Sequence, residues 1–278
     1  MSLVLSAKFK SQTLPKSDIS RRTMMREAPK LLLATLLFSS LSFAFDFSSA
    51  DAFFKNREGN FTAISDAKAS YRKALTESRK EDKIYAAQQL GKLAYYEGDL
   101  LLGEKEHTKR VKIFEECMND MEHVNLKAVG KNPTYYLFKA MCLGLWGKSK
   151  GMFAAARRVG ELKSLIQDGL SVDADYDAGG LSRLYAAVYI QSKLMGLYDL
   201  EGALKRVNRS IELGPNYYNS YLIKAEVLKE MGKNDEAIKL LTQIDQKIRS
   251  TPLPVGLEPE TKLIHKLITD KLARMQGH

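Results

Sequence analysis

Two stretches near the C-terminus decide the fold: Tyr198-Asp-Leu-Glu-Gly-Ala203-x3-Val207-x2-Ser210 and Gly232-Lys-Asn-Asp-Glu-Ala237-x3-Leu241-x2-Ile244. Ala203 and Ala237 are 34 residues apart, and each is followed at i+4 and i+7 by residues on the same helical face. A small residue lets two helices approach closely, and the residues after it cover the neighbouring pair of helices. The pattern therefore predicts helical hairpins that repeat along the chain.

A 34-residue period is typical of tetratricopeptide (TPR) repeats, in which each hairpin buries its apolar side against its neighbours. We therefore predict an all-α, TPR-like helical-hairpin solenoid over residues 45–250. The repeats are irregular, because the segment 169–176 aligns with 210–217 at a separation of 41 residues. Residues 251–278 are predicted to form a linker and a C-terminal capping helix with apolar pairs at Leu263/Ile264 and Leu267/Ile268.

Caps and apolar spacing predict the other helices. We expect a helix over 65–79, and another over 84–96 that ends in a turn at Gly98-Asp99 and is followed by a helix to about Glu122. Pro133 is expected to open the next helix, since proline is favoured in the first helical turn. A loop is expected over 171–180.

The N-terminus has the features of a secretory signal. Charged residues 26–30 precede an uncharged apolar run, Leu31 to Phe45, and Ser42-Phe-Ala44 offers small residues for cleavage after Ala44. The run has 15 residues, fewer than the ~20 of a membrane-spanning helix. Residues 1–44 are thus predicted to be an N-terminal extension and a cleaved signal peptide, with a retained anchor as the alternative. No cysteine lies at or directly after the run, where a lipid would be attached, so the periplasmic product is expected not to be a lipoprotein.

The basic residues do not indicate nucleic-acid binding. The formal net charge is +10, and residues 1–44 carry seven Lys/Arg against two Asp/Glu, so cleavage removes half of the excess. The remaining lysines are scattered at the spacing of a solvated helix face, without a basic block or interleaved aromatic residues.

Cys117 and Cys142 are the only cysteines. They lie at similar distances on either side of the turn expected at 129–133, so on antiparallel helices they would be at similar heights. In an exported protein such a pair can form a disulfide. Two buried free cysteines are the alternative, because equal height does not establish that the side chains face each other.

Four segments occur in an order that resembles a known family. They are an aromatic-rich helix ending Leu143-Gly-Leu-Trp146-Gly, the helix Ala154-Ala-Ala-Arg-Arg-Val159-x2-Leu162, the acidic loop Asp175-Tyr-Asp177-Ala-Gly179-Gly180 before Arg183, and the helix 199–215. This order is similar to that of the T-component proteins of tripartite ATP-independent periplasmic (TRAP) transporters. The resemblance implies a non-enzymatic accessory protein that binds a periplasmic solute-binding protein, with homo-oligomerisation as an option. Many members look like lipoproteins, and this chain departs from them.

No motif supports catalysis or a metal centre. The acidic loop places Asp173, Asp175 and Asp177 like the first ligands of a calcium loop, but Ala178 and Leu184 stand where glycine and a bidentate glutamate are needed. The sequence contains no HExxH, CxxC or GxSxG. We expect no enzymatic activity, metal or cofactor; a helical hydrolase is the disfavoured alternative.

The residues predicted to bind a partner or ligand are aromatic and charged side chains on the first helices of hairpins and beside the acidic loop. They are Tyr136, Trp146, Asp177, Arg183, Tyr185, Tyr189, Tyr218 and Tyr221. The predicted function is to dock a solute-binding protein and to hold a small, apolar ligand. The alternative is a general periplasmic scaffold for another envelope protein complex.

Overall fold

The computed structural model describes residues 44–103, 105–191 and 198–277. The predicted signal segment, 1–44, lies outside these ranges except for Ala44. Within them every regular element is a helix, and none is both long and apolar enough to cross a membrane. The helices are α1 (Ser48–Lys55), α2 (Phe61–Glu77), α3 (Lys80–Tyr95), the π-helix η1 (Tyr96–Leu101), α4 (His107–Met121), the 3-10 helix η2 (Glu122–Val124), α5 (Leu126–Val129), α6 (Pro133–Lys150), α7 (Met152–Asp173), α8 (Tyr176–Gln191), α9 (Leu200–Leu213), α10 (Tyr218–Glu230), α11 (Asn234–Ser250) and α12 (Glu258–Gln276).

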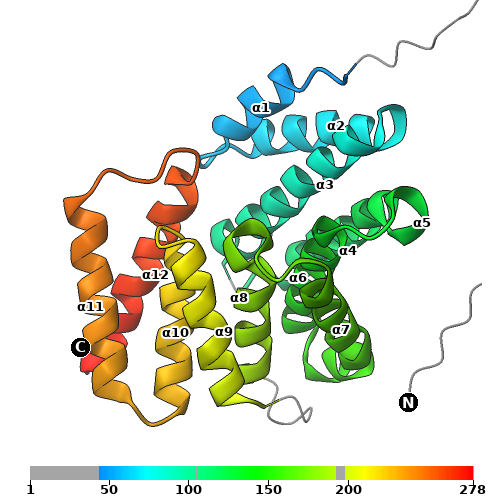
Figure 1. The fold of residues 1–278 in the computed structure, drawn as a ribbon. Coiled ribbons are helices and arrows are strands. Elements are labelled where there is room, and N and C mark those ends of the chain that lie inside the picture. The colour runs from blue at the N-terminus through cyan, green and yellow to red at the C-terminus, as the bar shows by residue number, and fades with distance from the viewer. Residues whose placement is uncertain (1–43, 104, 192–197, 278) are drawn as a thin grey trace, which may run out of the picture. The chain divides into compact units, whose positions relative to one another are not determined.

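Consecutive helices pack against each other, and short connections make several of them hairpins (Figure 1). Polar side chains set where helices begin. The Asn132 side chain accepts a hydrogen bond from Tyr135 N (3.1 Å), and Pro133 opens α6 as predicted. In the same way, Asp199 caps α9 by accepting from Gly202 N (2.9 Å).

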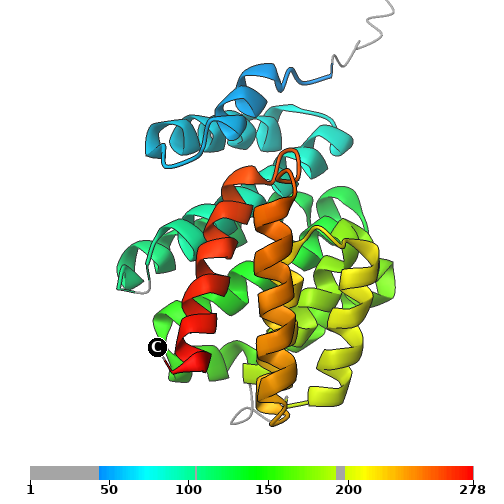
Figure 2. The same ribbon diagram turned by 90° about the vertical axis from the view of Figure 1, so that its left-hand side faces the viewer.

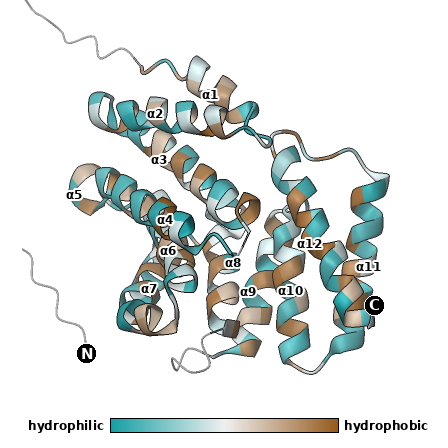
Figure 3. Cartoon of the chain, turned by 180° about the vertical axis from the view of Figure 1, so that it is seen from behind, coloured by the Kyte–Doolittle hydropathy of each residue, from teal (hydrophilic) through white to brown (hydrophobic). Residues whose placement is uncertain are grey.

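The buried faces of α9 and α11 confirm the spacing that predicted them. Ala203, Val207 and Ser210 are buried in α9, and Ala237, Leu241 and Ile244 are buried in α11. Apolar and polar residues alternate around these helices, as Figure 3 shows for α9 to α12. Burial of the apolar faces drives the packing, because each helix removes its hydrophobic side from water only by contact with a neighbour.

The turn predicted at Gly98-Asp99 is wrong. The helix instead continues past Tyr96 as η1, and α4 begins only at His107. Gly98 is in close contact with the next helix: a Cβ atom at this position would lie 2.7 Å from Phe114 Cζ. This glycine therefore serves close helix packing rather than chain reversal.

The loop predicted over 171–180 is also shorter than expected. α7 runs through Asp173, whose side chain accepts hydrogen bonds from Asp175 N and Tyr176 N (both 3.0 Å). Residues 177–179 then form a turn with positive φ at the start of α8. The chain thus reverses within a few residues, because the aspartate side chain satisfies backbone donors that a longer loop would leave to solvent.

α12 does more than cap the last hairpin. It packs against α10 and α11, and its first turn also contacts the connection between α1 and α2 (Figures 1 and 2). Arg57 Nη2 lies 2.5 Å from Glu260 Oε2, and Lys262 Nζ lies 2.7 Å from Glu58 Oε1. These pairs join the last helix to the first ones. The capping helix of an open array would contact only its neighbouring hairpin.

Candidate binding cavity

A cavity of about 660 Å³ lies between α3, α6, α7, α8, α10 and the start of α12. Its volume is in the range of small-molecule sites in proteins. Apolar side chains form much of its wall, including Leu137 and Met141 of α6, Leu184 of α8 and Leu222 of α10. Met152 also lines the cavity and is 54 % exposed, so the cavity reaches the surface at the turn between α6 and α7.

One wall of the cavity carries a polar stripe. Gln89, Lys92 and Tyr95 of α3 and Asp99 of η1 all line it. Their spacing of three to four residues places them on one side of the helix. The other side of α3 is anchored in the core by small and aliphatic residues: Ala86, Ala87, Leu90, Leu93 and Ala94. The helix is thus held rigidly with its polar side facing the cavity.

The opposite end of the cavity is built on a left-handed turn. Asp177, Ala178 and Gly179 have φ values of 52°, 51° and 72°. Left-handed backbone costs roughly 1–2 kcal/mol for each non-glycine residue. Gly179 also approaches another helix closely, since a Cβ atom there would lie 3.0 Å from Ser210 Cα. Such a turn persists only where surrounding contacts support it.

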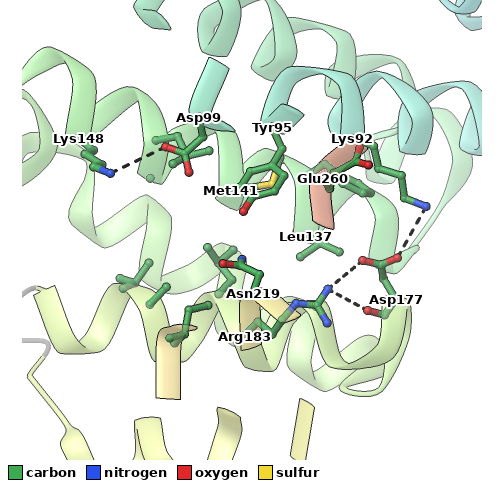
Figure 4. A pocket seen from close by; sticks show the side chains of 18 of the residues that line it. Lys92, Tyr95, Asp99, Leu137, Met141, Lys148, Asp177, Arg183, Asn219 and Glu260 are labelled. Carbon is green, nitrogen blue, oxygen red and sulfur yellow. Dashed lines mark hydrogen bonds and ion pairs between the residues drawn. The ribbon is translucent and has the colours of Figure 1, made fainter. Parts of the chain in front are cut away.

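Arg183 supplies that support. Its guanidinium donates to Ala178 O (2.7 Å), to Asp177 O (3.1 Å) and to Asp177 Oδ2 (3.1 Å), and it lies 4.6 Å from the centre of the Tyr217 ring. Figure 4 shows Asp177 between Arg183 and Lys92. Arginine suits this position because its planar fork holds several acceptors at once.

The charged groups around the cavity are paired with each other. Lys92 Nζ lies 3.9 Å from Asp177 Oδ1. Asp99 accepts from Arg110 (2.9 Å) and lies 3.9 Å from Lys148 Nζ. Arg57 and Glu260 form a further pair beside Gly256. The charges that line the cavity therefore largely compensate one another.

Half of the predicted binding residues meet in this cavity. Trp146, Asp177, Arg183 and Tyr218 line it. Trp146 Nε1 donates to Glu115 Oε1 (2.9 Å), and the Arg158 guanidinium lies 5.4 Å from the centre of the indole ring. Asp177 and Arg183 form one unit, because the Arg183 guanidinium donates to Asp177, so they are not two independent contacts for a ligand.

The other four predicted residues lie outside the cavity lining. Tyr136 is buried and packs beside Gly169. Tyr185 and Tyr189 stack on each other with ring centres 3.9 Å apart, and the Tyr185 hydroxyl donates to Asp199 Oδ2 (2.8 Å). Burial and this carboxylate raise the pKa of Tyr185. The Tyr221 hydroxyl donates to Pro215 O (3.1 Å). These contacts are internal to the fold: Tyr136 packs on α7, Tyr185 reaches the residue that caps α9, and Tyr221 reaches the turn before α10.

Sequence reasoning missed several cavity residues, notably Gln89, Lys92 and Asn219. The sequence does contain a pattern that indicates the first two: polar residues recur at 89, 92, 95 and 99 in a segment otherwise rich in alanine and leucine. Asn219 carries no such signal, since a polar residue in the first turn of a helix is ordinary.

Cys117 of α4 and Cys142 of α6 are joined by a disulfide, with Cα atoms 6.2 Å apart. The bond crosses the interface between the two helices and lies on the buried side of α6, next to residues that line the cavity. In the described part of the chain there is no cluster of three or more His, Cys, Asp or Glu residues arranged to hold a metal ion.

No protein-family model matches the sequence, and no curated protein is significantly similar to it.

Proposed function

We propose that the chain is an exported, TPR-like helical binding protein that works as an accessory component of a TRAP-type transport system. In this role it docks a periplasmic solute-binding protein and holds a small ligand in the cavity. The observation that carries the proposal is a cavity of about 660 Å³ with largely apolar walls, lined by helices that pack against their neighbours. No chemical reaction is assigned to it.

An exposed apolar site beside the cavity supports docking. Phe153 is 82 % exposed at the start of α7, and its neighbour Met152 lines the cavity. Exposed aromatic and methionine side chains contribute large contact areas in protein interfaces. A partner bound here would lie over the opening at the α6–α7 turn, where ligand could pass between the two proteins.

The test is affinity capture from periplasmic extract with residues 45–278, with and without chemical crosslinking. We expect a solute-binding protein to be retained, and Phe153→Ser to reduce its retention about tenfold or more, in line with loss of an interface anchor. Leu126→Ser is the matched control, since Leu126 is also exposed but lies in α5, away from the cavity.

The alternative function, a general scaffold for an envelope complex, rests on the same exposed Phe153. Capture of envelope assembly proteins with no solute-binding protein, lost equally in Phe153→Ser, would favour it. Retention of neither class under crosslinking would contradict both.

A further inference from the structure

Three uncharged polar side chains face the cavity and have no hydrogen-bond partner among the described residues. They are Gln89 and Tyr95 from α3 and Asn219 from α10. Gln89 is only 9 % exposed as a residue and lines the cavity, so little of it is open to bulk water. Buried amides are nearly always hydrogen-bonded in proteins, because burial without a partner is destabilising. An unpaired amide at a cavity wall therefore points to a bound polar group.

The Tyr95 hydroxyl adds a second contact point. Burial raises its pKa, so the group stays protonated and can both donate and accept a hydrogen bond. Figure 4 shows Tyr95 and Asn219 entering the cavity from opposite walls, with Met141 and Leu137 near them. A ligand between these walls would meet amide and hydroxyl groups together with aliphatic surface.

The cations around the cavity are poorly placed to receive an anion. Arg183 is occupied by the left-handed turn, Arg57 by Glu260, and Lys92 lies against Asp177. The two other lining cations are paired as well, Lys148 with Asp99 and Arg158 with Glu161. A carboxylate ligand would have to displace one of these acidic side chains and leave it unpaired in a partly buried site. Displacing one partner of such a pair is unfavourable, whereas Gln89, Tyr95 and Asn219 need no displacement.

We infer that the cavity binds a molecule with an apolar body and an uncharged head group that both donates and accepts hydrogen bonds, and that it discriminates against a carboxylate on the same body. Gln89, Tyr95 and Asn219 contact the head group; Leu137, Met141 and Leu222 contact the body. A primary amide has the matching set of donors and acceptor. This inference rests on the proposed function, in which the cavity is a ligand site.

The test uses the purified full chain and N-phenyl-1-naphthylamine, an uncharged fluorescent probe of apolar sites. Decanamide and decanoate at pH 7.5 then compete for the probe; they share one alkyl chain and differ in the charge of the head. We expect decanamide to compete at a concentration at least about tenfold lower than decanoate. Tyr95→Phe and Gln89→Leu should each weaken decanamide about three- to tenfold, the size of one hydrogen bond, and leave decanoate unchanged.

Two controls keep the outcomes distinct. Ala187→Trp fills the cavity from α8, and Tyr221→Phe removes a hydroxyl outside the lining. A probe signal that is absent, or that Ala187→Trp does not reduce, would contradict the cavity as a ligand site and with it the ligand part of the proposed function. A signal lost in Ala187→Trp, but displaced by decanoate as well as by decanamide, would overturn only the inference. If circular dichroism shows that Gln89→Leu does not fold, the effect of Tyr95→Phe on competition by decanamide decides the test.

Discussion

The buried ion pair between Arg57 and Glu260 should contribute more to stability than any surface pair among the described residues. The Arg57 side chain is 2 % exposed and Glu260 is 13 % exposed. The guanidinium makes two hydrogen bonds to the carboxylate, at 3.0 Å and 2.5 Å, and two to the carbonyl oxygens of Phe54 and Gly256. It also lies 4.1 Å from the centre of the Phe54 ring. The group is fully satisfied only while Glu260 is ionised and in place.

Glu260→Gln leaves the buried guanidinium without a counter-charge. Removing one partner of a buried pair costs about 3–5 kcal/mol, because an uncompensated charge then stays out of water. Arg57→Met is expected to cost a similar amount of stability, because the carbonyl oxygens of Phe54 and Gly256 also lose their hydrogen-bond donor. The double variant should cost at least about 2 kcal/mol less than the sum of the two, because residues in one network are coupled.

The measurement is urea unfolding of the oxidised chain, followed by circular dichroism at 222 nm. Glu58→Gln is a matched control, because the exposed pair Glu58–Lys262 joins the same two segments and should contribute no more than about 1 kcal/mol. If Glu260→Gln destabilises the chain no more than Glu58→Gln, the reasoning that α12 closes the array through a buried pair is refuted.

Two further predictions concern the disulfide and one carboxylate. The disulfide closes a loop with a sequence separation of 25, so Cys117→Ala/Cys142→Ala should lower the free energy of unfolding by about 3 kcal/mol; two freely labelled thiols in the denatured, non-reduced wild-type chain would contradict the bond. Hydrogen bonds from Arg249 and His265 lower the pKa of Asp245 below its ordinary 3.8, so its contribution is present above about pH 4 and is lost as the pH falls through the lowered pKa. Asp245→Asn should therefore cost about 1–3 kcal/mol at pH 7 and progressively less below pH 4; a loss independent of pH, or an equal loss in the exposed Asp270→Asn, would contradict this.

Local and periodic features of the fold could be predicted from the sequence. The buried positions in α9 and α11 follow from 3.6-residue periodicity, and the start of α6 follows from Asn132 and Pro133. The role of Gly98 could not be predicted in the same way, because glycine is used both for chain reversal and for close helix packing. Only the position of Phe114, supplied by another helix, distinguishes the two uses.

The candidate site was predicted in part. Trp146 and Tyr218 were found as aromatic residues on helices, and Asp177 and Arg183 through the acidic loop. Tyr185 and Tyr189 were selected for the same reason, yet they stack on each other outside the cavity lining. Aromatic residues are used for packing as well as for binding, so residue type alone does not separate the two roles.

By itself the sequence determined that this chain is built from helices, where many of them begin, and which side of each is apolar, because those properties depend on residues within one or two turns. The tertiary structure decided which polar sides face a common cavity, which charges are paired, and that α12 returns to the first helices. Those relations join residues as far apart as Arg57 and Glu260. They depend on the angles at which many helices pack, which no local pattern specifies.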